Sequence, residues 1–306
     1  MTIRHKLSGI YSPVLTPFHP DLSPDTQAFV RHCQWLVAND CGLAVFGTNS
    51  EANSLSVAER CGLLDALLAA GVSPARLLPG TGCCSLTDTV ELTRYATAAG
   101  VGGVLMLPPF YYKGVSDEGL FRHFAEVIER VGDSRLRIYL YHIPPVAQVP
   151  LSLALIERLL KAYPTAIAGI KDSSGDWSNT EAMLKQFQPE GFDVFAGSEV
   201  FLLRTLRGGG AGCITATGNV NPTPMVTLFQ TWQVDAQADA QQAALDVTRA
   251  AFQKYPLISA MKSAVAHYGK RPSWRTVRPP LTELTPEQER LLVKSLDDIS
   301  FRMPGL

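Results

Sequence analysis

RIYLYHIPPVAQVPLSLALIERLLKAYPTAIAGIKD, residues 137–172, begins and ends with a short run of apolar, mostly β-branched and aromatic side chains. Such runs are typical of buried β-strands, and the chain between them can form a helix. Runs of this kind begin roughly every 20 to 35 residues along the chain. The eight runs are GIYSPVLTP, LAVFG, LLPGTG, GVLMLPP, RIYLYHI, AIAGIKD, DVFAGSE and GCITATG. Between them, residues such as Leu120, Phe124 and Val127 recur at helical spacing.

This alternation predicts the fold class. Strands that alternate with helices pair in parallel through right-handed crossovers, and eight such units closed into a ring form a (β/α)8 TIM barrel. A doubly wound open sheet is the alternative, but its glycine-rich fingerprint is missing after the first strand, in YSPVLTPF. After Pro222-Thr223-Pro224 the strand signals stop and only helical patterns follow. We therefore predict an α/β protein with a barrel over residues 1–224 and a C-terminal helical extension over residues 225–306.

Composition and charge limit the classes of partner. The chain has 306 residues, 46% of them hydrophobic and 18% charged, as in a globular protein with one large core. Lys and Arg total 27 against 28 Asp and Glu, and no basic run alternates with aromatic residues, so nucleic acid is not an expected partner. No window of about 20 apolar residues would cross a membrane. We expect a cytoplasmic protein.

The cysteines do not indicate a metal site. They show neither paired CxxC spacing nor a histidine at ligand spacing. Cys83 and Cys84 are adjacent, and either redox activity or ordinary packing is compatible with that arrangement. The six are Cys33, Cys41, Cys61, Cys83, Cys84 and Cys213.

Lys171 is the most informative candidate for catalysis. In a parallel barrel the carboxyl ends of the strands meet at one mouth, and Lys171 ends the apolar run AIAGIK. Burying an ammonium group there is unfavourable, so the environment favours the neutral amine, which is a nucleophile. An ion pair with Asp172, or a side chain that reaches solvent, would equally account for a lysine at this position.

Tyr141 ends the run RIYLY on the strand next to that of Lys171. Its hydroxyl could approach the amine and transfer a proton between a carbonyl oxygen and bound intermediates. A buried tyrosine bonded to one backbone carbonyl is the alternative. By strand alternation, His142 points away from Tyr141.

A short polar loop, Gly47-Thr48-Asn49-Ser50-Glu51, follows the second run. Its hydroxyl and backbone N–H groups precede a helix that starts near Ser56, so they could bind a carboxylate or a phosphate. A simple turn followed by a capping box between Ser56 and Glu59 is the other interpretation.

Taken together, these residues resemble the pyruvate-dependent class I aldolase family that includes dihydrodipicolinate synthase and N-acetylneuraminate lyase. The matching pieces extend over the whole predicted barrel in family order. They are SPVLTPF, GTNSE, PPFYYKG, YLYHIPP, GIKDSSGD, FAGSE and GGGAGCITATGNV. The resemblance implies a TIM barrel, Schiff-base chemistry on a 2-oxo acid such as pyruvate, no metal or organic cofactor, and a homo-oligomer, a tetramer or a dimer.

The resemblance also implies roles for single residues. Lys171 is similar to the Schiff-base lysine, Tyr141 to the proton-relay tyrosine, and Tyr112 to a tyrosine that completes a hydroxyl relay across a subunit contact. Thr48 and Asn49 resemble the pair that holds the substrate carboxylate. Residues lining the pocket would be Ser173, Gly197 and Ile214. In this scheme Lys171 condenses with the ketone, and the protonated imine accepts the electrons released when a C–C bond breaks.

Two positions depart from the family pattern. Synthases of dihydrodipicolinate usually carry an arginine five positions after the relay tyrosine, where this chain has Val146. Valine cannot replace a guanidinium that binds a carboxylate. Glycine is also more common in the family than Ser50, and a serine held at positive φ would cost about 1 kcal/mol.

The expected function is therefore a lyase or aldolase that acts on a 2-oxo acid. The motifs PPFYYKG, GIKDSSGD and FAGSE particularly resemble 4-hydroxy-2-oxoglutarate and 2-keto-3-deoxy sugar acid aldolases. Alternatives are a dihydrodipicolinate (4-hydroxy-tetrahydrodipicolinate) synthase, a dehydratase or deaminase that uses the same imine, and a silent protein that only binds 2-oxo acids. A barrel enzyme for phosphosugars is disfavoured, since TATGNVNPTP has no arginine or lysine.

Overall fold

The computed structural model describes residues 7–306, in which strands and helices alternate from β1 to β7 and helices alone follow. The chain divides into two compact units. Unit 1 contains residues 7–9 and 73–214, and unit 2 contains residues 10–72 and 215–306.

Unit 1 is built on five parallel strands that pair in chain order. Their bounds are β3 (Val104–Met106), β4 (Ile138–His142), β5 (Ile167–Asp172), β6 (Asp193–Ala196) and β7 (Gly212–Ile214). All residues of β4 and β6 are buried, as expected for parallel strands covered on both faces. Tyr141 on β4 pairs with Lys171 on β5, and Lys171 pairs with Phe195 on β6.

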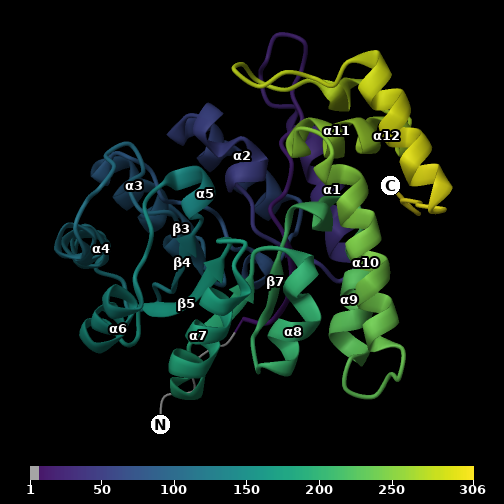
Figure 1. Cartoon of the computed structure of the whole chain (residues 1–306). Coiled ribbons are helices and arrows are strands. Elements are labelled where there is room, and N and C mark those ends of the chain that lie inside the picture. Colours follow the sequence, from purple (N-terminus) through teal and green to yellow (C-terminus); the bar gives the residue numbers. More distant parts are fainter. Residues whose placement is uncertain (1–6) are drawn as a thin grey trace. The chain divides into compact units, whose positions relative to one another are not determined.

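Helices cover the strands of unit 1, and α3, α4, α6 and α7 follow one another along their outer face (Figure 1). The α-helices are α3 (Leu86–Ala98), α4 (Asp117–Val131), α5 (Pro144–Ala147), α6 (Leu153–Ala162), α7 (Trp177–Phe187) and α8 (Leu202–Arg207). Short 3-10 turns are η3 (Pro74–Arg76), η4 (Gln188–Glu190) and η5 (Glu199–Phe201). In α4 the predicted face is confirmed, because Leu120, Phe124 and Val127 are buried.

The third predicted strand, LLPGTG, is not a strand in the structure. It makes a single parallel bridge, between Gly80 and Leu105. Leu105 donates its N–H to the Pro79 carbonyl at 2.8 Å and accepts the Thr81 N–H at 3.0 Å. Proline has no N–H with which to continue the ladder, so the pairing stops there. The prediction of a strand was wrong for this run. Six of the other runs contain strands, and LAVFG overlaps β2 only at Leu43.

Unit 2 contains β2, β1 from residue 10 onward, and every helix after residue 214. Strands β1 (Gly9–Ser12) and β2 (Gly42–Leu43) pair in parallel through Tyr11 with Gly42 and Ser12 with Leu43. A Cβ atom at Gly42 would lie 2.4 Å from the Tyr11 ring, which explains the glycine.

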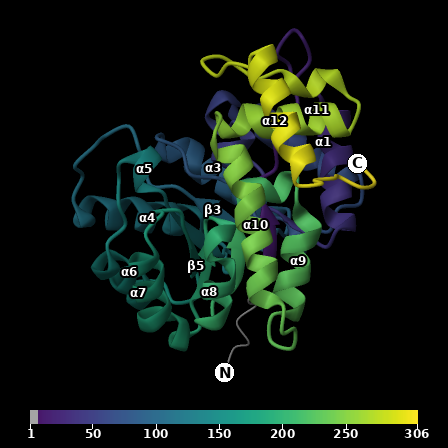
Figure 2. The ribbon, with the colours of Figure 1, turned by 45° about the vertical axis from the view of Figure 1, so that its right-hand side comes forward.

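The helices of unit 2 confirm that only helices follow residue 222 (Figure 2). The α-helices are α1 (Thr26–Ala38), α2 (Val57–Ala69), α9 (Pro222–Thr231), α10 (Ala238–Gln253), α11 (Leu257–Tyr268) and α12 (Pro286–Asp298). Short 3-10 turns are η1 (Thr48–Ser50), η2 (Ala52–Ser54), η6 (Ala216–Asn219) and η7 (Pro272–Arg275). In both views α9 and α10 lie side by side. The predicted division into residues 1–224 and 225–306 stays a prediction.

Candidate active site

Lys171 and Tyr141 lie together at the carboxyl ends of β5 and β4. Both are 2% exposed. The Lys171 ammonium nitrogen, Nζ, lies 4.2 Å from the centroid of the Tyr141 ring. Within residues 7–306, Lys171 forms no ion pair with a carboxylate. The strand register thus brings the two predicted catalytic side chains into contact.

Asp172, the residue next to Lys171, is committed to other partners. Its carboxylate accepts the Ser174 N–H at 3.0 Å, the Thr180 hydroxyl at 2.6 Å and the Asn179 amide at 3.1 Å. The alternative in which Asp172 neutralises Lys171 is therefore wrong. These bonds instead attach the end of β5 to the first turn of α7. They thereby hold the backbone next to Lys171 in place.

His142, next to Tyr141 on β4, has a structural role. Its Nδ1 accepts the Leu151 N–H at 3.0 Å and so holds the segment that follows α5. Burial lowers the pKa of His142, and the charge of Asp172 opposes this only in part. An acceptor role for Nδ1 requires a ring without a proton there, which the lowered pKa favours. Tyr139, lower on the same strand, donates its hydroxyl to Asp193 at 2.8 Å.

Ser173, Gly197 and Ile214 end or follow the next strands of unit 1. Ser173 donates its N–H to the His142 carbonyl and Gly197 donates its N–H to the Asp172 carbonyl, both at 2.7 Å. A Cβ atom at Gly197 would lie 2.0 Å from the Ser173 hydroxyl oxygen, so only glycine fits there. That oxygen is buried and has no hydrogen-bond partner in the described part of the chain. The Ser173 hydroxyl is therefore a buried polar group whose hydrogen-bonding capacity is not used by the described residues.

Tyr112 lies in the exposed loop after β3. Among residues 7–306, no contact joins it to Lys171, Tyr141 or the other predicted site residues of unit 1. Its side chain is 70% exposed, and its ring packs edge to face on Tyr111 at 5.4 Å between centroids. Lys113, the next residue, donates to the Ala147 carbonyl at 2.8 Å, which ties this loop to α5. On α5, Val146 is 61% exposed.

Thr48 and Asn49 form the turn η1 in unit 2, partly exposed at the loop that the sequence indicated. Ser50 is buried, and its hydroxyl accepts the Gly47 N–H at 3.1 Å while its carbonyl accepts the Thr16 hydroxyl at 2.8 Å. The expectation of positive φ at Ser50 was wrong. The left-handed residues flanking this turn are Phe46 (φ 61°) and Glu51 (φ 56°). Serine therefore closes the turn without strain.

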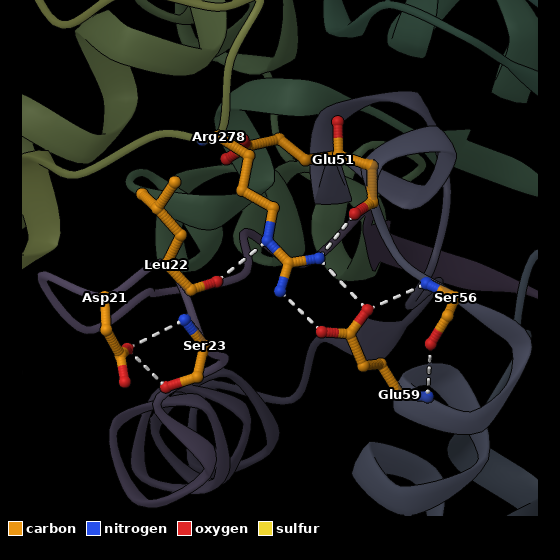
Figure 3. A network of polar contacts seen from close by, with 8 residues as sticks. Asp21, Leu22, Ser23, Glu51, Ser56, Glu59 and Arg278 are labelled. Carbon is orange, nitrogen blue, oxygen red and sulfur yellow. Dashed lines mark hydrogen bonds and ion pairs between the residues drawn. The ribbon is translucent and has the colours of Figure 1, made fainter.

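The sequence did not reveal the groups that hold this loop. Arg278 donates its backbone N–H to Glu51 at 2.9 Å, and its guanidinium donates to the Leu22 carbonyl at 2.9 Å and to Glu59 (Figure 3). Glu59 also accepts the Ser56 N–H at 2.8 Å, which confirms the predicted capping box of α2. The hydrogen bonds from Arg278, more than any other cause, lower the pKa of Glu59 to about 2. No local pattern signals a partner more than 200 positions away.

Three further features of residues 7–306 concern metal binding, membrane spans and cavities. No group of three or more His, Cys, Asp and Glu side chains in this part of the chain is arranged to hold a metal ion. Nor is any helix in it both long and apolar enough to cross a membrane. A cavity of about 320 Å³ in unit 2 is lined by residues such as His32, Trp35 and Trp274, none of which is a predicted site residue.

Comparison with known proteins identifies the family. Residues 6–299 match the model of the dihydrodipicolinate synthetase family. The chain belongs to this family. A DapA-like lyase of uncharacterised function from Chloroflexus aurantiacus is 33% identical over 282 residues, which cover 92% of this chain and 93% of the relative.

Solved structures of family members show the same fold. Dihydrodipicolinate synthase from Agrobacterium tumefaciens is 32% identical, with a TM-score of 0.87 over 95% of this chain and 99% of that one. YagE, a prophage protein of the dihydrodipicolinic acid synthase family from E. coli K12, was solved in complex with pyruvate. It is 28% identical, with a TM-score of 0.89 over 96% of this chain and 99% of that one.

Membership confirms the predicted fold class, the TIM barrel with a C-terminal helical region that dihydrodipicolinate synthetase family members share. It also confirms that the protein is a lyase of this family. Family enzymes act through a Schiff base between a lysine and pyruvate and need no external cofactor.

Proposed function

We propose that Lys171 forms the Schiff base and that the enzyme is an aldolase for a short 4-hydroxy-2-oxo acid. The observation that carries this proposal is the buried Lys171 amine, 4.2 Å from the Tyr141 ring centroid and without a carboxylate partner in the described residues. An amine held in a buried position beside an aromatic ring, and not engaged by a carboxylate, can act as a nucleophile toward a carbonyl carbon. A purely structural lysine would be expected to have an anionic partner.

The proposed reaction begins with condensation and continues with cleavage of a C–C bond. Nζ attacks the ketone carbon, a C–N bond forms, and the carbonyl oxygen leaves as water. In cleavage, the bond between C3 and C4 breaks and its electron pair enters the protonated imine to give an enamine. Tyr141 relays the proton of the C4 hydroxyl, accepting it while its own phenol proton passes on to solvent, and the C4 carbon becomes the carbonyl of the aldehyde. Protonation of the enamine at C3 and hydrolysis of the imine release pyruvate.

Binding of the 2-oxo acid is assigned to the remaining predicted residues. We propose that Thr48 and Asn49 bind the substrate carboxylate through the hydroxyl and N–H groups of their turn, and that Ser173, Gly197 and Ile214 line the pocket. The unpartnered Ser173 hydroxyl supports this assignment. Holding the carboxylate orients the ketone toward the amine and supplies proximity.

Synthesis of dihydrodipicolinate is a less favoured role, although relatives carry that name. A 4-hydroxy-tetrahydrodipicolinate synthase from Anaplasma marginale is 30% identical over 285 residues. Here the position that carries an arginine in typical synthases is Val146, on a solvent-exposed turn of α5. Without a guanidinium, a second substrate's carboxylate lacks its bidentate partner.

Product analysis with 4-hydroxy-2-oxoglutarate tests the reaction. The proposal predicts stoichiometric pyruvate and glyoxylate from the wild-type enzyme and none from Lys171→Ala. Loss of water or ammonia from related substrates, without cleavage, would instead establish a dehydratase or deaminase. Binding of pyruvate without any turnover, unaffected by Lys171→Ala, would establish a silent binding protein.

We also propose that the active enzyme is a cytoplasmic homo-oligomer, as the family resemblance implies. The exposed pair Tyr111 and Tyr112 supports a contact between copies, because two aromatic rings on one loop are an unusually large apolar surface to leave in water. In that arrangement Tyr112 would complete a hydroxyl relay in a neighbouring subunit.

A further inference from the structure

Lys262 is a buried cation outside the proposed catalytic residues. It lies on α11, whose residues 259–266 are all buried. Its side chain and that of Glu51 are both 0% exposed, and the two form an ion pair. Lys262 also donates to the Thr276 carbonyl at 2.7 Å and lies 4.5 Å from the centroid of the Phe18 ring.

Glu51 is the residue that ends the Thr48–Asn49 turn. Its backbone is left-handed (φ 56°, ψ 33°), a conformation in which a residue with a side chain is strained unless its surroundings hold it. The surroundings here are the Lys262 ammonium and the Arg278 N–H, which bind the Glu51 carboxylate from two sides. The turn is therefore held in place through the side chain of its last residue.

A second set of contacts from the same segment holds the loop further along. The Arg278 guanidinium donates to the Ser54 carbonyl and binds the Glu59 carboxylate (Figure 3). The Phe18 ring lies against both cations, Lys262 and Arg278. Residues 51, 54 and 59 are thus attached to Lys262 and Arg278. The loop has little freedom while these contacts last.

The buried pair does not serve stability alone. Burial lowers the pKa of Lys262 to about 8, and the carboxylates of Glu51 and Glu283 oppose this by favouring the charged form. Arg278 adds to the lowering. Since the folded pKa lies below the ordinary 10.5, folding becomes less favourable as the pH falls from 10.5 to 8. A buried ion pair is in general weak evidence for added stability, so a further role for this pair is worth testing.

We propose that Lys262 and Glu51 are positioning residues that set the affinity for the 2-oxo acid by fixing the turn that binds its carboxylate. This inference rests on the proposed function, in which Thr48 and Asn49 bind that carboxylate. It assigns to the C-terminal helical region an effect on substrate affinity that acts through the turn. Lys262 itself does not contact the substrate in this proposal.

The test compares wild-type enzyme with the double variant Glu51→Gln and Lys262→Met, which removes both charges together and leaves no unpaired buried ion. Pyruvate is titrated in the presence of borohydride, and covalent labelling of the protein is measured. We expect the double variant to need at least about tenfold more pyruvate for half-maximal labelling, with a plateau rate within about threefold of wild type. Lys294→Met, a surface change on α12, should match wild type.

A second measurement, the pH dependence of lactate inhibition, can be made on the wild-type enzyme. Lactate has the carboxylate of pyruvate but no ketone, so its competition against pyruvate reports carboxylate binding. In wild-type enzyme its inhibition constant should rise several-fold between pH 7 and pH 9, as Lys262 loses its proton and the pair with Glu51 is lost. In a folded double variant this rise should be absent.

The outcomes separate this inference from the proposed function. Two results would overturn the positioning role and leave the Schiff-base proposal intact. One is that wild type and the folded double variant are labelled with the same half-saturating pyruvate concentration. The other is that the lactate inhibition constant of wild type does not change between pH 7 and pH 9. No labelling of wild-type enzyme by pyruvate would overturn the proposed function and this inference with it.

Discussion

Lys171 and Tyr141 show how strand register places chemistry at single residues. The two residues are paired across β4 and β5, and alternation turns Asp172 and His142 to the other face, where both have structural partners. The sequence was sufficient for this part of the site, because strand alternation and parallel pairing determine which side chains meet. It was not sufficient at Ser50, where a side-chain hydrogen bond replaced the expected strain.

Tyr141→Phe separates the proton transfer from packing. The phenylalanine ring keeps the surface that covers the Lys171 amine and lacks only the hydroxyl. We expect cleavage of 4-hydroxy-2-oxoglutarate to slow by about 10²-fold to 10⁴-fold, with thermal stability close to wild type. Steady-state rates and melting temperatures check this. Turnover within a few-fold of wild type would remove Tyr141 from the proposed relay.

Val146→Arg tests the position that departs from typical synthases. The side chain is 61% exposed, so the substitution has room. In the condensation direction, we expect the half-saturating concentration of glyoxylate to fall by about tenfold, because a charge-assisted hydrogen bond contributes about 1.5 to 3 kcal/mol. The value for pyruvate should not change. Val146→Met is the control for side-chain size, and an equal effect from methionine would contradict the electrostatic explanation.

At the scale of elements, the loop before α2 combines a locally encoded cap with distant contacts. The capping box of Ser56 and Glu59 follows from their spacing and was predictable. The ion pair of Glu59 with Arg278 joins residues 219 positions apart and was not. Likewise, six strands were predictable from apolar runs and β2 lies at the edge of a seventh run, whereas Pro79 interrupts the pairing of the run that forms only a bridge.

The acid stability of this loop should depend on Glu59. Its pKa is lowered to about 2, chiefly by hydrogen bonds from Arg278. A lowered carboxylate pKa stabilises the fold above its ordinary value of 4.5, and the contribution is lost as the pH falls toward 2. Urea unfolding should show wild type more stable than Glu59→Gln at pH 6, with the difference shrinking between pH 5 and pH 2.

The control for Glu59 is Glu126→Gln, which removes an exposed pair with Arg130 on α4. Exposed pairs contribute little, so this variant should follow wild type throughout the pH range. A constant difference between wild type and Glu59→Gln at all pH values would show that the carboxylate charge is not what stabilises the loop.

At the scale of the whole molecule, chain order and spatial organisation differ. The sequence predicts a boundary near residue 224, because strand signals stop there. One compact unit combines residues 10–72 with residues 215–306, and the predicted boundary stays a prediction. Contacts such as that of Arg278 with Glu51, 227 positions apart, hold unit 2 together, and a sequence pattern does not reveal such pairs.

The proposed oligomer predicts a mass of two or four times 33.2 kDa in light scattering after size-exclusion chromatography. Replacing Tyr111 and Tyr112 together by serine should shift the enzyme toward smaller species and lower its cleavage rate, because both the apolar contact and the relay hydroxyl are lost. A wild-type monomer with full activity would exclude the relay between subunits.

The most direct test of the account is to trap the imine and locate it. Wild-type protein is incubated with pyruvate, reduced with borohydride, digested and analysed by mass spectrometry. The account predicts one N-carboxyethyl group per chain, on Lys171, and no labelling of Lys171→Ala. An unmodified protein, or a reduced adduct on a different lysine such as Lys113, would contradict it.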